Sequence, residues 1–293
     1  MTFSIVAYDN SVSPPEWGVA VASKFLAVGA VVPWARADAG ALATQAFANL
    51  AYGPDGIERL GNGEEAQSVV DALTQADESR EDRQLGVVDA AGRAATFTGS
   101  QCFDWAGGRT GDGYCCQGNI LTGPEVVDRM AEAFESATGD LATRLLEALA
   151  AGDAAGGDRR GKQSACLLVV REGGGYGGGI DKAVDLRVDD DPDPVPELAR
   201  VFAIHKLLFP RPEDLDFIEI DDELAREVRE LLIATGYLDA GQEGSGYGEG
   251  AKKALFGYVG TENLEERWSD EAKIERAVLE HLRSSKSGST GYL

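Results

Sequence analysis

The feature that most constrains this chain is a pair of short apolar runs at its very start. The runs "FSIVAYD" over residues 3–9 and "WGVAVAS" over residues 17–23 are rich in β-branched and aromatic residues, which favour strands. The segment between them, "NSVSPPE", has two adjacent prolines and is typical of a turn. The spacing predicts an antiparallel hairpin that holds residue 2 within a strand, where chain ends otherwise fray.

Beyond the hairpin, strand-like and helix-like segments occur in groups. Residues 54–76 place Ile57, Leu60, Val69 and Leu73 at helical intervals, whereas the runs before and after them favour strands. The further expected elements are strands over 27–35 and 40–47, a helical segment over 54–76, a strand–turn–strand over 83–99, a helical block over 122–152 broken at Thr138–Gly139, a hairpin around a glycine-rich loop over 163–190, and a helix over 194–209.

This order of elements predicts a fold of class α+β. Two antiparallel sheets packed face to face, with helices outside both, would bury every apolar face in a four-layer αββα sandwich over residues 1–209. A doubly wound parallel sheet is less favoured, because strands and helices do not alternate one to one.

The character of the chain changes after Phe209. A proline- and acid-rich joint, "PRPEDLDFIEID", is followed by amphipathic segments over 222–238 and 270–285. These predict a small, mostly helical domain over residues 213–285, and the last residues, 286–293, have the composition of a flexible tail.

The charge balance limits the partners of the protein. Lysine and arginine total 27 and aspartate and glutamate total 50, so the formal net charge is −23. Neither a nucleic acid nor an anionic membrane surface is an expected partner, because both attract clusters of lysine and arginine. An acid-rich surface suits the salt-rich cytoplasm of a halophile and equally suits an ordinary acidic protein, and the sequence leaves both open.

The cysteines and histidines give no pattern of a metal site. Cys102, Cys115, Cys116 and Cys166 lack the paired spacing of zinc ligands, and the chain has two histidines. These residues therefore predict no metal site. The start lacks the basic and apolar regions of a secretory signal, and no apolar run of 18 residues occurs, so a cytoplasmic protein is expected.

One motif resembles a nucleotide site but lacks the context for it. Residues 156–162 contain a GxxxxGK string, yet Gln163 stands where a P-loop has serine or threonine. A helix is expected before that string and a strand after it, the reverse of a P-loop. No GxSxG elbow occurs, and His205 and His281 fall in helical segments where a structural role is the simpler interpretation.

Thr2 is the strongest candidate nucleophile. Removal of an initiator methionine before a small residue would leave Thr2 at the N-terminus, where its own α-amine can accept the hydroxyl proton. The ordinary pKa of such an amine, about 7.7–8.0, suits that task near neutral pH. The competing interpretation is that Met-Thr is a common start and that the strand is only structural.

Several motifs, in order along the chain, resemble one known family. They are "MTFSIVA", "WGVAVASKFLAVGAVVPWA", "ATQA", "RQLGVVD", "FTG", "QGN", "GGDRRGKQSA" and "VDLRVDD". Residues 1–209 resemble the DUF1028 family of the N-terminal-nucleophile (Ntn) hydrolase superfamily, and "VGTENLEERW" resembles a peptidoglycan-binding domain. The resemblance implies amide-bond hydrolysis by an N-terminal threonine without a metal or organic cofactor. A histidine often follows the "VDLRVDD" run, whereas this chain has Asp191 there.

The resemblance also suggests roles around the expected nucleophile. Ser23 and Lys24 end the second strand, and the ammonium of Lys24 would lower the pKa of the Thr2 amine. Asn119 offers an amide donor to an oxyanion. The alternatives are a surface lysine and a turn-forming asparagine.

A second group of candidates would contact the substrate or hold the amine. Asp158, Arg159 and Arg160 stand before a strand, where they would position the amine and bind a substrate carboxylate, or form a structural ion-pair cluster. Gln45 and Gln163 are further candidates for substrate binding.

Two classes of function follow from these candidates. The first is an Ntn-type hydrolase acting on a small amide or peptide-like substrate. The second is a binding protein that keeps the sandwich without turnover and recognises a glycan or a protein partner. The sequence leaves the substrate and a homo-oligomeric state open.

Overall fold

The first strand, β1 (Thr2–Asp9), lies inside a six-stranded sheet in the computed structural model, which describes residues 2–241 and 246–285. It pairs antiparallel with β2 (Glu16–Ser23), which confirms the predicted hairpin, and with β8 (Tyr114–Asn119) on its other side. The sheet has the order β10-β9-β2-β1-β8-β7. Its other strands are β7 (Gly107–Gly111), β9 (Ser164–Val170) and β10 (Lys182–Val188), of which β7 and β10 form the edges.

A second antiparallel sheet has the order β3-β4-β5-β6 and faces the first. Its strands are β3 (Pro33–Arg36), β4 (Gly40–Ala46), β5 (Arg83–Asp89) and β6 (Ala94–Thr98).

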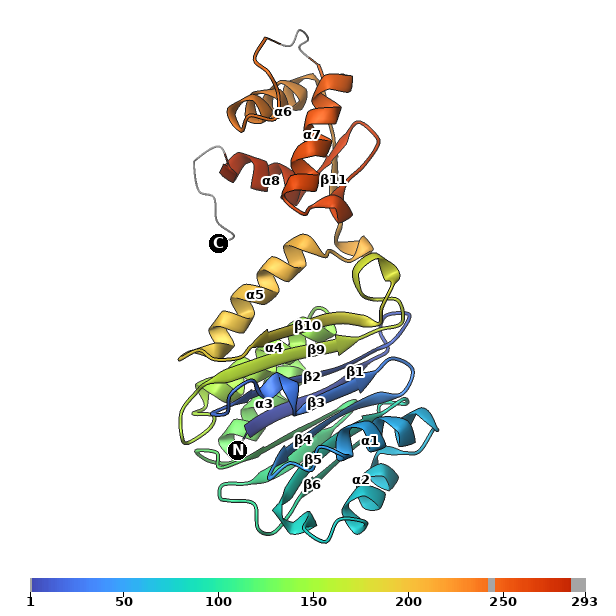
Figure 1. Cartoon of the computed structure of the whole chain (residues 1–293), viewed down its shortest axis with the longest axis vertical. Helices are drawn as coiled ribbons and strands as arrows, with labels where there is room; N and C mark the ends of the chain where they lie inside the picture. Colours follow the sequence, from blue (N-terminus) through green and yellow to red (C-terminus); the bar gives the residue numbers. More distant parts are fainter. Residues whose placement is uncertain (1, 242–245, 286–293) are drawn as a thin grey trace. The chain divides into compact units, whose positions relative to one another are not determined.

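Two pairs of helices cover the outer faces of the sheets (Figure 1). Helices α1 and α2 pack on the second sheet, and α3 and α4 pack on the first. Their bounds are α1 (Tyr52–Gly61), α2 (Ala66–Gln75), α3 (Glu125–Ser136) and α4 (Leu141–Ala154). This arrangement confirms the predicted four-layer αββα sandwich of class α+β.

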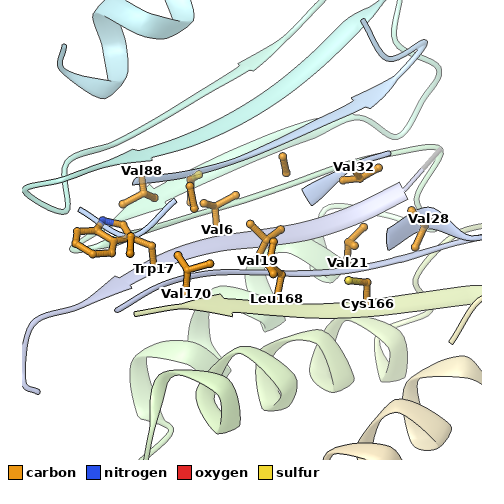
Figure 2. Packing of buried hydrophobic residues seen from close by; sticks show 14 residues of the cluster. Val6, Trp17, Val19, Val21, Val28, Val32, Val88, Cys166, Leu168 and Val170 are labelled. Carbon is orange, nitrogen blue, oxygen red and sulfur yellow. The ribbon is translucent and has the colours of Figure 1, made fainter. Parts of the chain in front are cut away.

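Successive side chains of each strand point to opposite faces of the sheet, as the pleat requires. On β1, Phe3 packs beside Gly152 of α4, whereas Val6 points between the sheets. Figure 2 shows the apolar cluster of the inner layer, which we call the apolar layer. Its buried members are Val6, Trp17, Val19, Val21, Val28, Val32, Ala37, Ala41, Ala43, Val88, Cys115, Cys166, Leu168 and Val170.

Some expected elements differ from the observed ones. The expected strand over 27–35 begins as a short 3-10 turn, η1 (Val28–Ala30), and only its end belongs to β3. The helical segment over 54–76 is two helices, because the "NGE" sequence after Gly61 breaks it. Strands β7 and β8 were not expected. The other 3-10 turns are η2 (Arg80–Asp82), η3 (Tyr176–Gly178), η4 (Pro212–Asp214) and η5 (Glu265–Arg267).

The chain divides into two compact units, Met1–Val201 and Phe202–Leu293, and helix α5 (Pro194–Leu208) contains the boundary. The elements of the second unit are β11 (Phe217–Glu219), α6 (Asp222–Ala234), α7 (Glu249–Thr261), β12 (Lys273–Glu275) and α8 (Arg276–Ser285). The expected helix over 270–285 starts only at α8, because β12 pairs with β11. Helix α7 was not expected, and the expected tail over 286–293 lies outside the described residues.

The second unit has its own small core. Side chains of α6, α7 and α8, among them Leu232, Leu255 and Leu282, form one buried cluster. Across residues 2–241 and 246–285, no helix combines the length and the apolar character needed to cross a membrane.

Candidate active site

Thr2 opens β1 between two neighbouring strands. Its backbone pairs with Ser23, the last residue of β2, and with Asn119, the last residue of β8. The Thr2 Oγ1 and Ser23 Oγ atoms lie 3.1 Å apart, and the side chains of all three residues are buried. The antiparallel register therefore brings these three candidate residues together at one end of the sandwich.

Gln84 of β5 connects the two sheets at this end. Its Oε1 atom accepts hydrogen bonds from Gln45 Nε2 and from Asn119 Nδ2, both at 2.8 Å. Its Nε2 atom donates to the carbonyl oxygen of Gly118 at 2.7 Å. The Gln45 amide also lies 3.4 Å from the carbonyl oxygen of Thr2. Gln84 thus fixes the amide orientations of Gln45 and Asn119 on either side of Thr2.

A second set of bonds extends this network one step inward. Ser4 Oγ donates to Gln45 Oε1 and accepts from Gln117 Nε2, both at 2.7 Å. The buried Gln117 Oε1 has no hydrogen-bond partner among the described residues. A Cβ atom on Gly86 would lie 2.1 Å from that oxygen, so only glycine leaves room for the Gln117 side chain. We call Thr2, Ser4, Gln45, Gln84, Gln117 and Asn119 the polar layer.

Asp158 anchors the loop that follows β2. Its carboxylate accepts the backbone N–H of Lys24 at 3.0 Å and the backbone N–H of Arg160 at 2.9 Å. The Arg160 guanidinium adds bonds at 3.1 and 2.7 Å. The Asp158 side chain is only 2% exposed, whereas that of Arg160 is 33% exposed. Asp158 and Arg160 therefore form a largely shielded ion pair that holds the end of β2.

The other charged candidates lie in the adjoining loops. Lys24 Nζ donates to the carbonyl oxygen of Lys162 at 3.1 Å. The Lys162 ammonium pairs with Asp153 at 2.6 Å and Asp193 at 2.7 Å, and these bonds raise its pKa. No contact between the Lys24 ammonium and Thr2 is present among residues 2–241 and 246–285.

The side chains of Arg159 and Gln163 differ in their hydrogen-bond partners. Gln163 Nε2 donates to Asp190 Oδ1 at 3.0 Å on the surface. Arg159 is exposed, and its backbone N–H donates to the carbonyl oxygen of Ile120 at 2.9 Å, one residue beyond Asn119. Its guanidinium makes no hydrogen bond or ion pair with any described residue.

Comparison with known proteins identifies the family of the chain. Residues 2–198 match the family described as "Family of unknown function (DUF1028)". The chain belongs to the DUF1028 family. Residues 208–282 match the family described as "Putative peptidoglycan binding domain".

A solved DUF1028 structure has the same fold. The crystal structure of protein SPO2555 from Silicibacter pomeroyi is 32% identical, with a TM-score of 0.64. The match covers 70% of this chain and 86% of that one. No curated protein gives a significant match.

The polar layer of this DUF1028 protein consists of hydroxyl and amide groups without a titratable side chain. Such groups can donate to a developing oxyanion and accept from an amine, and they stay neutral across the physiological pH range. Analysis of the sequence missed Ser4, Gln84 and Gln117. The signal for them was present, because each lies two or four residues along the same strand face from a buried apolar residue, namely Val6, Val88 or Cys115.

A separate cavity of about 510 Å³ lies between α1 and α2, and no candidate site residue lines it. Asp77 accepts hydrogen bonds there from Arg83, Asn49 and Tyr52. The bond from Arg83 holds the pKa of Asp77 well below its usual range, and burial raises the pKa of Tyr52. These contacts join Tyr52 of α1 and the segment after α2 to Arg83 of β5.

Proposed function

We propose that this DUF1028 protein is an amide-bond hydrolase in which Thr2 acts as the nucleophile after cleavage of the bond before it. The observation that carries the proposal is the position of Thr2 on β1. Its Oγ1 lies 3.1 Å from Ser23 Oγ of β2, and its backbone pairs with Asn119 of β8. A hydroxyl held in this way by two strands is pre-positioned for attack.

The reaction needs only groups of the chain, the substrate and water. Thr2 Oγ1 bonds to the substrate carbonyl carbon while its proton passes to the freed α-amine. The amine then gives this proton to the leaving nitrogen as the C–N bond breaks, and an ester on Thr2 remains. Water adds to the ester in the same way, so the carboxylic acid leaves and Thr2 regains its hydroxyl.

Asn119 is proposed to stabilise the oxyanion. One N–H of its amide donates to Gln84 Oε1, and a primary amide has a second N–H. Because Gln84 fixes this amide, the second N–H has a defined direction before substrate binds, and pre-organised donors of this kind contribute most to rate. The proposed setting is the cytoplasm, which fits four free cysteines.

The match of residues 208–282 favours a second candidate function. In that case the second unit would recognise a glycan, and the sandwich would be a support without turnover. The two candidates differ in whether Thr2 reacts.

The test combines the intact mass with a covalent probe. We expect the purified chain to lack Met1 and to form one adduct with an epoxyketone, which requires both a hydroxyl and a free α-amine on one residue. The adduct should map to Thr2. A protein that keeps Met1, or an adduct that persists in Thr2→Ala, would contradict the proposal. The matched control is Ser4→Ala, which removes a hydroxyl from the same strand and should still be labelled.

A further inference from the structure

Three large apolar side chains are exposed around the Thr2 end of the sandwich. Phe25, Phe47 and Phe103 are 52%, 58% and 54% exposed. Exposed phenylalanine is unfavourable in water, and a group of such residues marks a binding surface more often than a bare surface.

Each phenylalanine is tied by the backbone to a residue that contacts Thr2. Phe25 lies two residues beyond Ser23, and its carbonyl oxygen accepts from Ser164 Oγ at 2.5 Å. Phe47 lies two residues beyond Gln45, and its carbonyl oxygen accepts from Arg83 at 2.5 Å. These contacts fix both loops next to the strand ends that carry the polar layer.

Phe103 approaches from a third loop. Its carbonyl oxygen accepts the N–H of Ile120 at 3.0 Å, directly after Asn119. Its ring meets that of Phe47 edge to face, with the centroids 6.0 Å apart. The three phenylalanines therefore come from separate loops, and all border the end of the sandwich where Thr2 lies.

A cation lies beside this apolar surface. Arg159 donates its backbone N–H to the same Ile120 that bonds Phe103, and its guanidinium is not paired with any described residue. Its neighbour Arg160 is held by Asp158. In a chain with a formal net charge of −23, a guanidinium left without a carboxylate is available for an external anion.

We infer that the substrate of this site is an amide that carries both an apolar group and a carboxylate, the chemistry of an N-acyl amino acid. The phenylalanines would bind the apolar group, and Arg159 would bind the carboxylate. A carboxylate matches the planar, bidentate geometry of a guanidinium. The inference rests on the proposed function, since it assigns a substrate class to the same site.

The test measures binding without turnover. In the Thr2→Ala variant, calorimetry would compare N-phenylacetylglycine with its glycinamide analogue, which lacks the carboxylate, and with N-acetylglycine, which lacks the ring. We expect the first to bind at least about tenfold more tightly than either of the others. The readout is a ratio of affinities and not a rate, so failure of this inference can be told apart from failure of Thr2 as the nucleophile.

Further substitutions in the Thr2→Ala background show which residues recognise the carboxylate and which recognise the ring. Adding Arg159→Gln should reduce the preference for the acid over the amide to less than about twofold, and adding Phe47→Ala with Phe103→Ala should do the same for phenylacetyl over acetyl. The controls are Arg200→Gln on α5 and Phe256→Ala in the second unit, an exposed cation and an exposed ring elsewhere. They should change neither preference.

Three outcomes would overturn the inference. The first is equal affinity for the acid and the amide, or no binding of the acid at its solubility limit. The second is a preference that survives the paired variants. The third is a dimer in analytical ultracentrifugation that Phe47→Ala with Phe103→Ala dissociates, because a second copy would then cover the surface.

Discussion

The two ends of the layer between the sheets are built from the same strands but from opposite chemistry. On β5, Gln84 and Val88 both point inward and are fully buried, yet one belongs to the polar layer and the other to the apolar layer. On β1 the same change occurs between Ser4 and Val6. Figure 2 shows Val6 and Val88 within the apolar layer. Burial is therefore equal at both ends, and only the side-chain chemistry differs.

This difference separates stability from function. The apolar layer stabilises the sandwich through area removed from water, about 25 cal/mol for each Å², with little demand on direction. The polar layer has to satisfy each amide with a partner, since an unpaired buried group costs about 1–3 kcal/mol. Stability from the apolar end allows the other end to hold oriented donors around Thr2.

The largest effect is expected at Thr2, the proposed nucleophile. Thr2→Ala should lower amide hydrolysis by at least about 10³-fold, because the attacking oxygen is lost. Its stability should fall by only about 1 kcal/mol, for the lost bond to Ser23. Thr2→Ser should keep part of the activity, since it retains the hydroxyl and the α-amine but lacks the methyl group that restricts χ1. Rates would be measured on an amide found by screening.

The matched change at the other end of β1 is Val6→Ala. It should cost about 2 kcal/mol in the free energy of unfolding, through the cavity it leaves, and should preserve the rate within about twofold. If Val6→Ala lowered the rate as strongly as Thr2→Ala, the division between the two ends would be wrong.

The next effect concerns the connection between the sheets. Gln84→Leu keeps the volume but leaves Gln45 and Asn119 without their shared acceptor, so we expect a loss of at least about 2 kcal/mol. Urea unfolding would measure it beside Val88→Ala, a change in the apolar layer on the same strand. A Gln84→Leu variant as stable as the wild type would show that the network does not hold the sheets together.

A smaller effect is expected at Gly86. An alanine Cβ there would meet Gln117 Oε1 at 2.1 Å, so Gly86→Ala should cost about 1–3 kcal/mol through crowding. In a Gln117→Ala background the same change should cost less, because the crowded side chain is gone. A double-mutant cycle measures this difference, and additive losses would mean that the two residues do not interact.

Most of the fold could be predicted from the sequence, because most strands and helices of the sandwich show their own apolar periodicity. The hairpin of β1 and β2 and the helices over 122–152 are confirmed. Strands β7 and β8 were missed because "GGRTG" has no apolar residue and "YCCQGN" ends in polar ones. β8 pairs with β1, more than 100 residues earlier in the chain, and β7 pairs with β8. The sequence of a short segment does not specify so distant a partner.

The candidate site was only partly predictable for the same reason. Hairpin register alone places Ser23 opposite Thr2. The contacts of Gln84 with Gln45 and Asn119 cross from one sheet to the other, which no spacing in the sequence specifies. For Asp158 the sequence leaves open a role at the amine and a structural ion pair, and the bonds to Lys24 and Arg160 that accompany the second become visible only in the fold.

The smallest effect is expected from chemical modification of Cys102. This thiol is half-buried, whereas Cys115 and Cys166 lie in the apolar layer, where burial raises the pKa of each to about 12. Thiols in the unfolded chain have a pKa of about 8.5, so the stability contributed by keeping the buried ones protonated is fully present below that pH. It is lost as the pH rises from there towards 12.

Labelling with a thiol-reactive disulfide is therefore carried out at pH 8, below the pH at which the buried thiols begin to destabilise the fold. We expect one reactive thiol per native chain, four in denaturant, and no reaction in Cys102→Ser. The labelled protein should unfold within about 0.5 kcal/mol of the unlabelled one, because the modified side chain lies outside both layers. Rapid reaction of Cys115 or Cys166 would show that the apolar layer opens in the native state, and the two ends would then differ less in rigidity than their packing implies.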